Sequence, residues 1–221
     1  MTEKKTGAPG GSQTLSRGLI ALAMIGESEA PLTVADLAAR LGIHRSMANR
    51  LVRTFEQHGF ALRTPSGNLE LGARLVALAR GVAKDLQAVA APELSAVADE
   101  LGMTAFLVVY DGEAAVTLSN AEPRHADTTV AQRPGSRHSI DRGAPGRVIR
   151  SQLHPDRFPP QRFEHSRDEV LPGVSSIAVP LRLPQGEYAA IAVIYLPRPL
   201  DEEHVAGVLL DAAKRIAAAL R

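Results

Sequence analysis

The 221-residue chain contains no cysteine and no tryptophan, and aromatic residues make up only 4% of it. The lack of cysteine excludes a disulfide framework, a thiolate nucleophile and a cysteine-ligated metal site. No stretch of the sequence approaches the roughly 18 consecutive apolar residues that are needed to cross a membrane. The apolar run at residues 19–25 is too short, and begins too late, for a signal peptide. We therefore expect a cytoplasmic protein that makes no contact with a membrane.

The usual sequence patterns of enzymes and metal sites are also missing. No serine lies in a G-x-S-x-G turn, which leaves a hydrolase without its nucleophile. The segment at residues 143–146 lacks the Lys-Ser/Thr pair of a phosphate-binding loop, although Arg142 and Arg147 beside it suit an anion. The seven histidines show none of the spacings of metal ligands. The sequence thus predicts no catalytic residue, no metal and no cofactor.

What the chain does have is an uneven distribution of charge. Residues 1–90 carry 11 Lys and Arg against 7 Asp and Glu, whereas residues 91–221 carry 14 against 17. The first part therefore has a net charge of +4 and the second a net charge of −3. Such a separation suits a protein that places one end on phosphates and keeps the other end away from them.

Residues 33–71 have the order of a winged helix-turn-helix. Thr33 and Asp36 form a capping-box pattern before a short helix, which Gly42 ends because glycine adopts the left-handed conformation without strain. A second helix is predicted at about residues 45–58. Residues 60–62 and 69–71 alternate around a turn of Pro, Ser, Gly and Asn, which predicts a two-stranded wing.

The polar face of the second helix carries side chains that bind base edges and phosphates. Arginine pairs with guanine and asparagine with adenine, while serine bonds to either bases or backbone oxygens. Any one of these side chains alone is more often ordinary surface, but the ordered combination of cap, turn, polar face and wing favours DNA binding. We expect the first four of the following residues in the major groove and the others as further DNA contacts: Arg45, Ser46, Asn49, Arg50, Arg53, Thr33, Arg63 and Thr64.

Apolar periodicity predicts the remaining organisation. Residues 1–12 are expected to be disordered, residues 13–72 to form the DNA-binding domain, residues 73–90 an uninterrupted linker helix, and residues 91–221 a second domain. Leu15, Leu19, Leu22 and Met24 begin the first helix, which Gly26 closes. The apolar seam of the linker helix either packs on its own chain or pairs with a second copy, and we favour pairing because palindromic operators require dimers.

The second domain is predicted to be of the α+β class, with helices gathered on an antiparallel sheet. Asp111 and Gly112 mark a hairpin between strands at 104–110 and 114–119. Residues 127–132 suggest a third strand, and residues 176–183 and 188–196 another pair. Helices are expected at 92–101, 147–153 and 201–220.

These features resemble the IclR family of bacterial transcription regulators over most of the chain. The segments that carry the resemblance are residues 15–19, 38–60 and 71–75 in the first half, and 111–113, 134–137, 146–147 and 171–174 in the second. The resemblance implies a GAF-like effector domain that binds a small molecule, often an organic or aromatic acid. It also implies dimers, and in some members tetramers.

The family's ligand contacts map onto the second half of this chain. The corresponding residues are Ile140, Asp141, Gly146, Arg147, Ser166, Val174, Ser176, Ala192 and Ile194. Two of them depart from the family, because Ala192 and Ile194 replace positions that are often polar and face the ligand. The segment between Leu153 and Leu171 is also shorter than in the family.

Three hypotheses about the function remain open. The first is a homodimeric, sequence-specific regulator whose effector is an organic acid or a more apolar molecule. The second is a constitutive DNA-binding regulator whose sensor domain is degenerate. The third, an enzyme that uses a C-terminal pocket, rests only on scattered His, Asp and Arg near residues 138–147.

Overall fold

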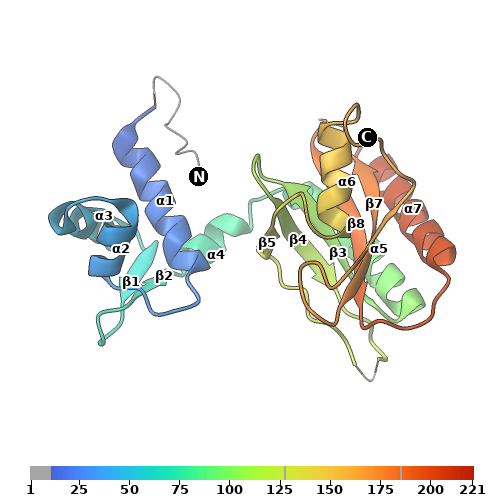
Figure 1. Cartoon of the computed structure of the whole chain (residues 1–221), viewed down its shortest axis with the longest axis horizontal. Coiled ribbons are helices and arrows are strands. Elements are labelled where there is room, and N and C mark those ends of the chain that lie inside the picture. Colours follow the sequence, from blue (N-terminus) through green and yellow to red (C-terminus); the bar gives the residue numbers. More distant parts are fainter. Residues whose placement is uncertain (1–10, 127, 185) are drawn as a thin grey trace. The chain divides into compact units, whose positions relative to one another are not determined.

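The computed structural model describes residues 11–126, 128–184 and 186–221, and it divides the chain between Val82 and Ala83 into two compact units (Figure 1). The predicted disordered tail falls largely on residues 1–10, which lie outside the described residues. Ser12, at the end of that tail, caps the first helix by accepting a hydrogen bond from the Leu15 amide. Among the described residues, no helix is both long and apolar enough to cross a membrane.

The N-terminal unit is a winged helix-turn-helix, as predicted. Its elements are α1 (Gln13–Glu27), α2 (Val34–Leu41), α3 (Arg45–Gln57), β1 (Ala61–Arg63), β2 (Leu69–Leu71) and α4 (Arg74–Ala79). The two strands pair in antiparallel register and form the wing. Its core is aliphatic apart from one phenylalanine, and the fully buried side chains include those of Ala21, Leu37, Ala48 and Val52.

Local chemistry sets the limits of α2. The Thr33 hydroxyl accepts a hydrogen bond from the Asp36 amide, and the Asp36 carboxylate accepts one from the Thr33 amide, so the predicted capping box is complete. Gly42 ends the helix in the left-handed conformation, with a φ of 63°. The first helix differs slightly from its prediction, because α1 continues through Gly26 to Glu27.

The prediction of an uninterrupted linker helix over residues 73–90 was wrong. Helix α4 ends at Ala79, and the next helix, α5 (Lys84–Leu101), begins only after Ala83, which has a φ of 45°. The apolar spacing continues across this break, so periodicity alone does not reveal it. Helix α5 then passes through Pro92 and unites the end of the predicted linker with the predicted helix at 92–101.

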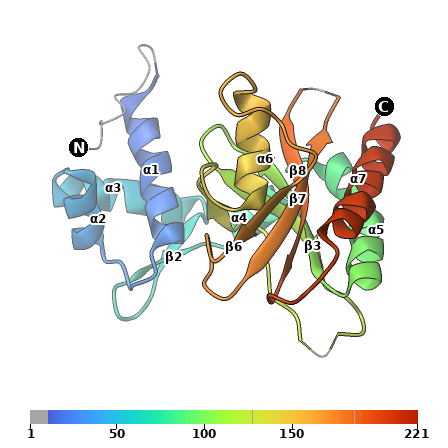
Figure 2. The same cartoon turned by 45° about the vertical axis from the view of Figure 1, so that its right-hand side comes forward.

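The C-terminal unit is built on a six-stranded antiparallel sheet, which confirms the α+β class. The strands are β3 (Thr104–Tyr110), β4 (Ala115–Ala121), β5 (Arg137–His138), β6 (Glu164–Arg167), β7 (Ser175–Arg182) and β8 (Tyr188–Tyr195), in the order β5-β4-β3-β8-β7-β6. Helices α5 and α7 (Glu202–Ala219) cover one face of the sheet, and α6 (Ala144–Leu153) lies on the other (Figures 1 and 2).

Alternation along the strands assigns the side chains to the two faces. Leu107, Ile177 and Ile191 pack against α5 and α7, whereas their neighbours Phe106, Ala178 and Ala192 pack against α6. Small alanines on the α6 side, at positions 178, 190 and 192, leave room for that helix to approach the sheet closely. Both faces are buried, which explains the almost continuous apolar composition of β8.

Both edges of the sheet differ from the sequence prediction. Residues 128–132 form no strand, and Asp127 lies outside the described residues, so the predicted third strand is wrong. The short strand β5 takes that edge by pairing with β4 at Ala115 and Val116. At the opposite edge, β6 pairs with β7, although the sequence analysis expected no strand there. Each edge strand has only one partner strand and is short, which leaves little periodicity to detect.

Candidate nucleic-acid interface and effector pocket

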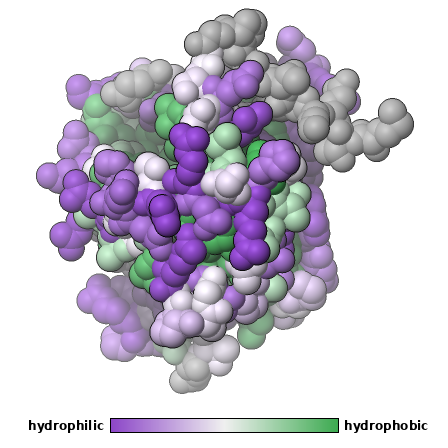
Figure 3. Space-filling view, turned by 90° about the vertical axis from the view of Figure 1, so that its left-hand side faces the viewer, coloured by the Kyte–Doolittle hydropathy of each residue, from purple (hydrophilic) through white to green (hydrophobic). Residues whose placement is uncertain are grey.

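The polar face of α3 is open in the N-terminal unit. Arg45, Ser46, Arg50 and Arg53 are exposed, while Ala48, Leu51, Val52 and Phe55 hold the opposite face of the helix in the core. Hydrophilic side chains dominate the side of this unit that faces the viewer in Figure 3. The helix therefore presents three guanidinium groups and a hydroxyl on a rigid support, which is the arrangement that base and phosphate contacts require.

Asn49 has a different environment from these four residues. Its side-chain amide donates to the Arg45 carbonyl at 3.1 Å, and its carbonyl oxygen accepts from Arg63 at 3.1 Å. Arg63 also forms an ion pair with Glu56, at 3.3 Å. In this structure Asn49 and Arg63 thus connect the wing to α3. These bonds use only one of the two N–H groups of the Asn49 amide and one lone pair of its oxygen, so they orient the side chain without excluding a contact with a base.

The hydroxyls of Thr33 and Thr64 are engaged in local structure. Thr33 completes the α2 cap, and its hydroxyl lies 2.6 Å from the Asp36 carboxylate. Thr64 accepts from the Asn68 amide at 3.1 Å and so fixes the turn of the wing. Both were predicted to contact DNA. Arg17 and His44, which were not predicted to do so, line a surface hollow together with Ser46 and Arg50.

The second candidate site is a pocket in the C-terminal unit, beside the start of α6. The enclosed cavity has a volume of about 50 Å³, and the whole hollow, including open solvent at its mouth, about 430 Å³. Four of the nine predicted effector residues line it, namely Ser166, Val174, Ser176 and Ile194. Gly143 and Pro145 also line it and belong to the loop and helix start at residues 140–147, where ligand contacts were expected. The remaining lining was not predicted: Phe106, Gln132, His138, Glu169, Val170, Leu171 and Ser175.

Five predicted effector residues lie outside this lining, and each has another environment. Ile140 and Ala192 belong to the core beneath α6, and Asp141 pairs with Arg150 at 3.2 Å. Gly146 allows the helix to approach the loop before it, because a β-carbon there would lie 2.8 Å from the Ser139 carbonyl oxygen. Arg147, the fifth, is the centre of a charge network.

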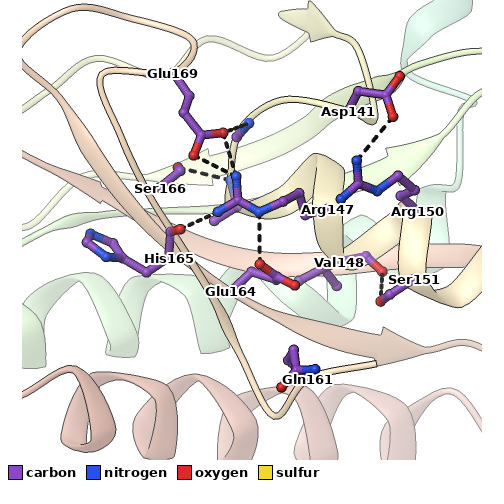
Figure 4. A network of polar contacts seen from close by, with 12 residues as sticks. Asp141, Arg147, Val148, Arg150, Ser151, Gln161, Glu164, His165, Ser166 and Glu169 are labelled. Atoms are coloured by element: carbon purple, nitrogen blue, oxygen red, sulfur yellow. Dashed lines mark hydrogen bonds and ion pairs between the residues drawn. The ribbon is translucent and has the colours of Figure 1, made fainter. Parts of the chain in front are cut away.

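Two carboxylates hold the Arg147 guanidinium (Figure 4). Glu164 accepts from Nε at 2.9 Å, Glu169 accepts from Nη1 at 2.5 Å, and the His165 carbonyl accepts from Nη2. Burial alone would lower the pKa of Arg147, but the hydrogen bonds to both carboxylates outweigh it and raise the pKa. The guanidinium is therefore fully charged and already neutralised by its own chain.

Glu169 makes a further contact at the beginning of α6. Its carboxylate accepts a hydrogen bond from the Gly143 amide at 2.9 Å. Burial would raise the pKa of Glu169, yet the hydrogen bonds from Arg147 and Gly143 lower it overall, so the group is ionised at neutral pH. Ser166 occupies the neighbouring position, where its hydroxyl accepts from the Ala144 amide at 3.0 Å.

Among the described residues that line the pocket, three buried polar atoms have no hydrogen-bond partner. They are Oγ of Ser175, Oγ of Ser176, whose residue is 8% exposed, and Nε2 of His138. Burial lowers the pKa of His138, so its imidazole is neutral at pH 7. Among the described residues, no group of His, Asp and Glu is arranged to hold a metal ion. The pocket is therefore suited to binding a small organic molecule through a few hydrogen bonds and apolar walls.

The capped helix pair, the wing and the polar α3 define a winged helix-turn-helix protein. Residues 14–65 match the IclR helix-turn-helix domain. The glycerol operon regulatory protein of Streptomyces griseus is 28% identical over 140 residues, which cover 62% of this chain and 55% of that protein. The chain thus spans about half the length of the curated relatives that it matches.

Solved structures share the fold of the whole chain. An IclR transcriptional regulator from Alicyclobacillus acidocaldarius has a TM-score of 0.79 at 21% identity, covering 96% of this chain and 100% of its own. An IclR homologue from Microbacterium hydrocarbonoxydans, solved with 4-hydroxybenzoate, has a TM-score of 0.73 at 21% identity, covering 95% and 99%. The resemblance to the IclR family is confirmed, and that family consists of transcription regulators rather than enzymes.

Proposed function

We propose that this chain is a sequence-specific DNA-binding transcription regulator that acts as a homodimer on a palindromic operator. The observation that carries the proposal is the exposed polar face of α3, with Arg45, Ser46 and Arg50, inside an IclR helix-turn-helix domain. These side chains enter the major groove, and Arg53 and Arg17 contact phosphates beside it. Asn49 and Arg63 orient the wing against α3 and contact DNA with the donors that these bonds do not use.

Exposed apolar side chains support the homodimer. Leu15 and Leu19 on α1 are 62% and 60% exposed, and Val76 in α4 is 68% exposed. Leucines and valines that remain exposed on one small unit are typical of surfaces that bind another protein. A second copy that covers them would present two α3 helices to successive major grooves, as a two-fold symmetric operator requires.

The test is to select fragments of the source genome with the purified protein at moderate salt and to sequence those retained. Enrichment of a two-fold symmetric site supports the proposal. Retention that is salt-sensitive but blind to sequence would contradict it, because the arginines would then contact phosphates only.

We infer further that a small molecule bound in the C-terminal pocket modulates this regulator. The support is the pocket itself, with its unpartnered Ser176 and His138 atoms. Such a molecule changes operator affinity only if it binds the DNA-competent and incompetent dimers with different affinity. The alternative is a constitutive regulator with a degenerate sensor, favoured by the internal neutralisation of Arg147. A molecule that both stabilises the protein and alters operator affinity would exclude that alternative.

A further inference from the structure

The carboxylate of Glu169 stands where the carboxylate of an acidic ligand would be expected. It lies at the N-terminus of the ten-residue helix α6, accepts from the Gly143 amide, and faces Arg147 across 2.5 Å. An amide at a helix start and a nearby guanidinium are together the usual receptor for an anion. In this protein both donors are already satisfied by the chain's own side chain, as Figure 4 shows for Arg147.

The pocket also has a second set of polar atoms, and these are not satisfied. Gly143, Glu169, His138 and Ser176 all line it. Ser176 Oγ and His138 Nε2 have no partner, and Ser176 is more than nine-tenths buried. Buried polar atoms without partners are costly, and three of the seven such atoms among the described residues, including Oγ of Ser175, belong to residues that line this one pocket. Their gathering there indicates where a bound molecule would donate and accept hydrogen bonds.

The charges around the pocket exclude one class of molecule. Among the described residues, no lysine or arginine lines it, whereas Glu169 does. Arg147, which lies behind Glu169, is shared with Glu164. Arg142, the other arginine beside the start of α6, donates to the backbone carbonyl of Glu169 from an exposed position and does not line the pocket. A carboxylate that entered would therefore meet the ionised carboxylate of Glu169 with no cation among the described residues of the lining, and would lose its hydration without compensation.

We propose that the carboxylate of Glu169 occupies the position between the Gly143 amide and Arg147 where an anionic ligand would otherwise bind. The pocket therefore accepts small uncharged molecules with hydrogen-bonding groups and rejects carboxylates. This inference rests on the proposed effector function and names its ligand class. The uncharged molecule places its apolar part against Phe106 and Ile194 and its polar group against Ser176 and His138. Removal of the Glu169 carboxylate then converts the pocket into a receptor for carboxylates.

The experiment compares benzamide with benzoate, two probes of nearly equal shape that differ in charge, by calorimetric titration of the full chain at constant ionic strength. The wild type is expected to bind benzamide at least about tenfold more tightly than benzoate. A factor of this size corresponds to one unfavourable contact between the benzoate carboxylate and the carboxylate of Glu169. In Glu169→Ala the preference reverses, and acetate, which replaces the deleted group, gains saturable binding. Acetamide, its uncharged counterpart, gains none.

Glu164→Ala is the matched control, because Glu164 also pairs with Arg147 but does not line the pocket. It causes the same change in charge and is expected to leave the preference for benzamide unchanged. Glu169→Gln keeps the shape of the side chain, and is expected to weaken rejection of benzoate without creating an acetate site. It serves as the second variant if Glu169→Ala does not fold.

Any one of three results would overturn the proposal. The first is that the wild type binds benzoate as tightly as benzamide, and the second is that neither probe binds saturably. The third is that Glu164→Ala and Glu169→Ala gain carboxylate binding equally. Operator binding is measured separately on the same proteins. If the pocket shows no preference for uncharged molecules but the protein still binds its operator, only the ligand class is wrong. If the protein binds no operator, the proposed regulatory function itself is wrong.

Discussion

Removal of Arg147 should expose the cost of leaving two carboxylates without their shared cation. In Arg147→Met the apolar part of the side chain is retained, but Glu164 and Glu169 lose their common partner. The Arg147 side chain is only 19% exposed, and the side chains of Glu164 and Glu169 are 20% and 33% exposed. Water therefore compensates the lost pairs only in part.

The magnitude follows from this partial burial. Breaking a fully buried ion pair by removing one partner costs about 3 to 5 kcal/mol. Exposed pairs contribute at most about 1 kcal/mol, so the exposure of Glu169 reduces the cost. We expect the free energy of unfolding of the C-terminal unit to fall by about 2 to 3 kcal/mol. Replacing both carboxylates by Gln in the same protein should restore most of this loss, because no unpaired charge remains.

The composition of the chain provides a selective assay. It contains no tryptophan, and its three tyrosines, at positions 110, 188 and 195, all lie in the C-terminal unit. Tyrosine fluorescence during urea unfolding therefore reports on that unit. A loss of less than about 0.5 kcal/mol in Arg147→Met, the range of ordinary surface substitutions, would show that Arg147 does not stabilise the two carboxylates.

Three further predictions concern stability. The pKa of Glu169 is lower in the folded protein than in the unfolded chain, so its ionised carboxylate contributes fully to the free energy of unfolding above the ordinary pKa near 4.5, and this contribution is lost as the pH falls through the folded pKa. In Glu169→Gln the urea midpoint should therefore depend less on pH over that range. A pH dependence equal to that of the wild type would contradict this. Gly146→Ala places a β-carbon 2.8 Å from the Ser139 carbonyl oxygen and should destabilise the C-terminal unit by about 1 to 3 kcal/mol by tyrosine-detected unfolding, whereas wild-type stability would be contrary. Thr33→Ala removes the cap shared with Asp36 and should cost about 1 kcal/mol, seen as faster hydrogen exchange of α2 amides; unchanged exchange would disprove it.

The N-terminal unit was predictable because its signals are local. The Thr33 cap, the Gly42 turn and the apolar stripe of α3 lie within a few residues of the structure that they specify. The engagement of Asn49 was not predictable, because its partner Arg63 is on the wing, fourteen residues away. Periodicity shows that Asn49 is on the polar face but cannot show which neighbour reaches it.

The C-terminal pocket was predicted only in part, for a related reason. Its walls come from β3, from the loop before α6 and from the segment after β6, which the sheet brings together. Family resemblance located Ser166 and Ser176, but neither resemblance nor spacing showed that Glu169 would reach the start of α6. The break at Ala83 was missed because the apolar spacing continues across it.

Operator binding by the wild type should be compared with that of Arg50→Ala, using a fragment obtained by selection and an unrelated fragment of equal length. Gln57→Ala, at the exposed end of α3, is the control for a general effect on the helix. We predict that Arg50→Ala loses about 1 to 3 kcal/mol of affinity for the selected site, with a much smaller loss on the unrelated fragment. Unchanged affinity for the selected site would show that this face of α3 does not read DNA.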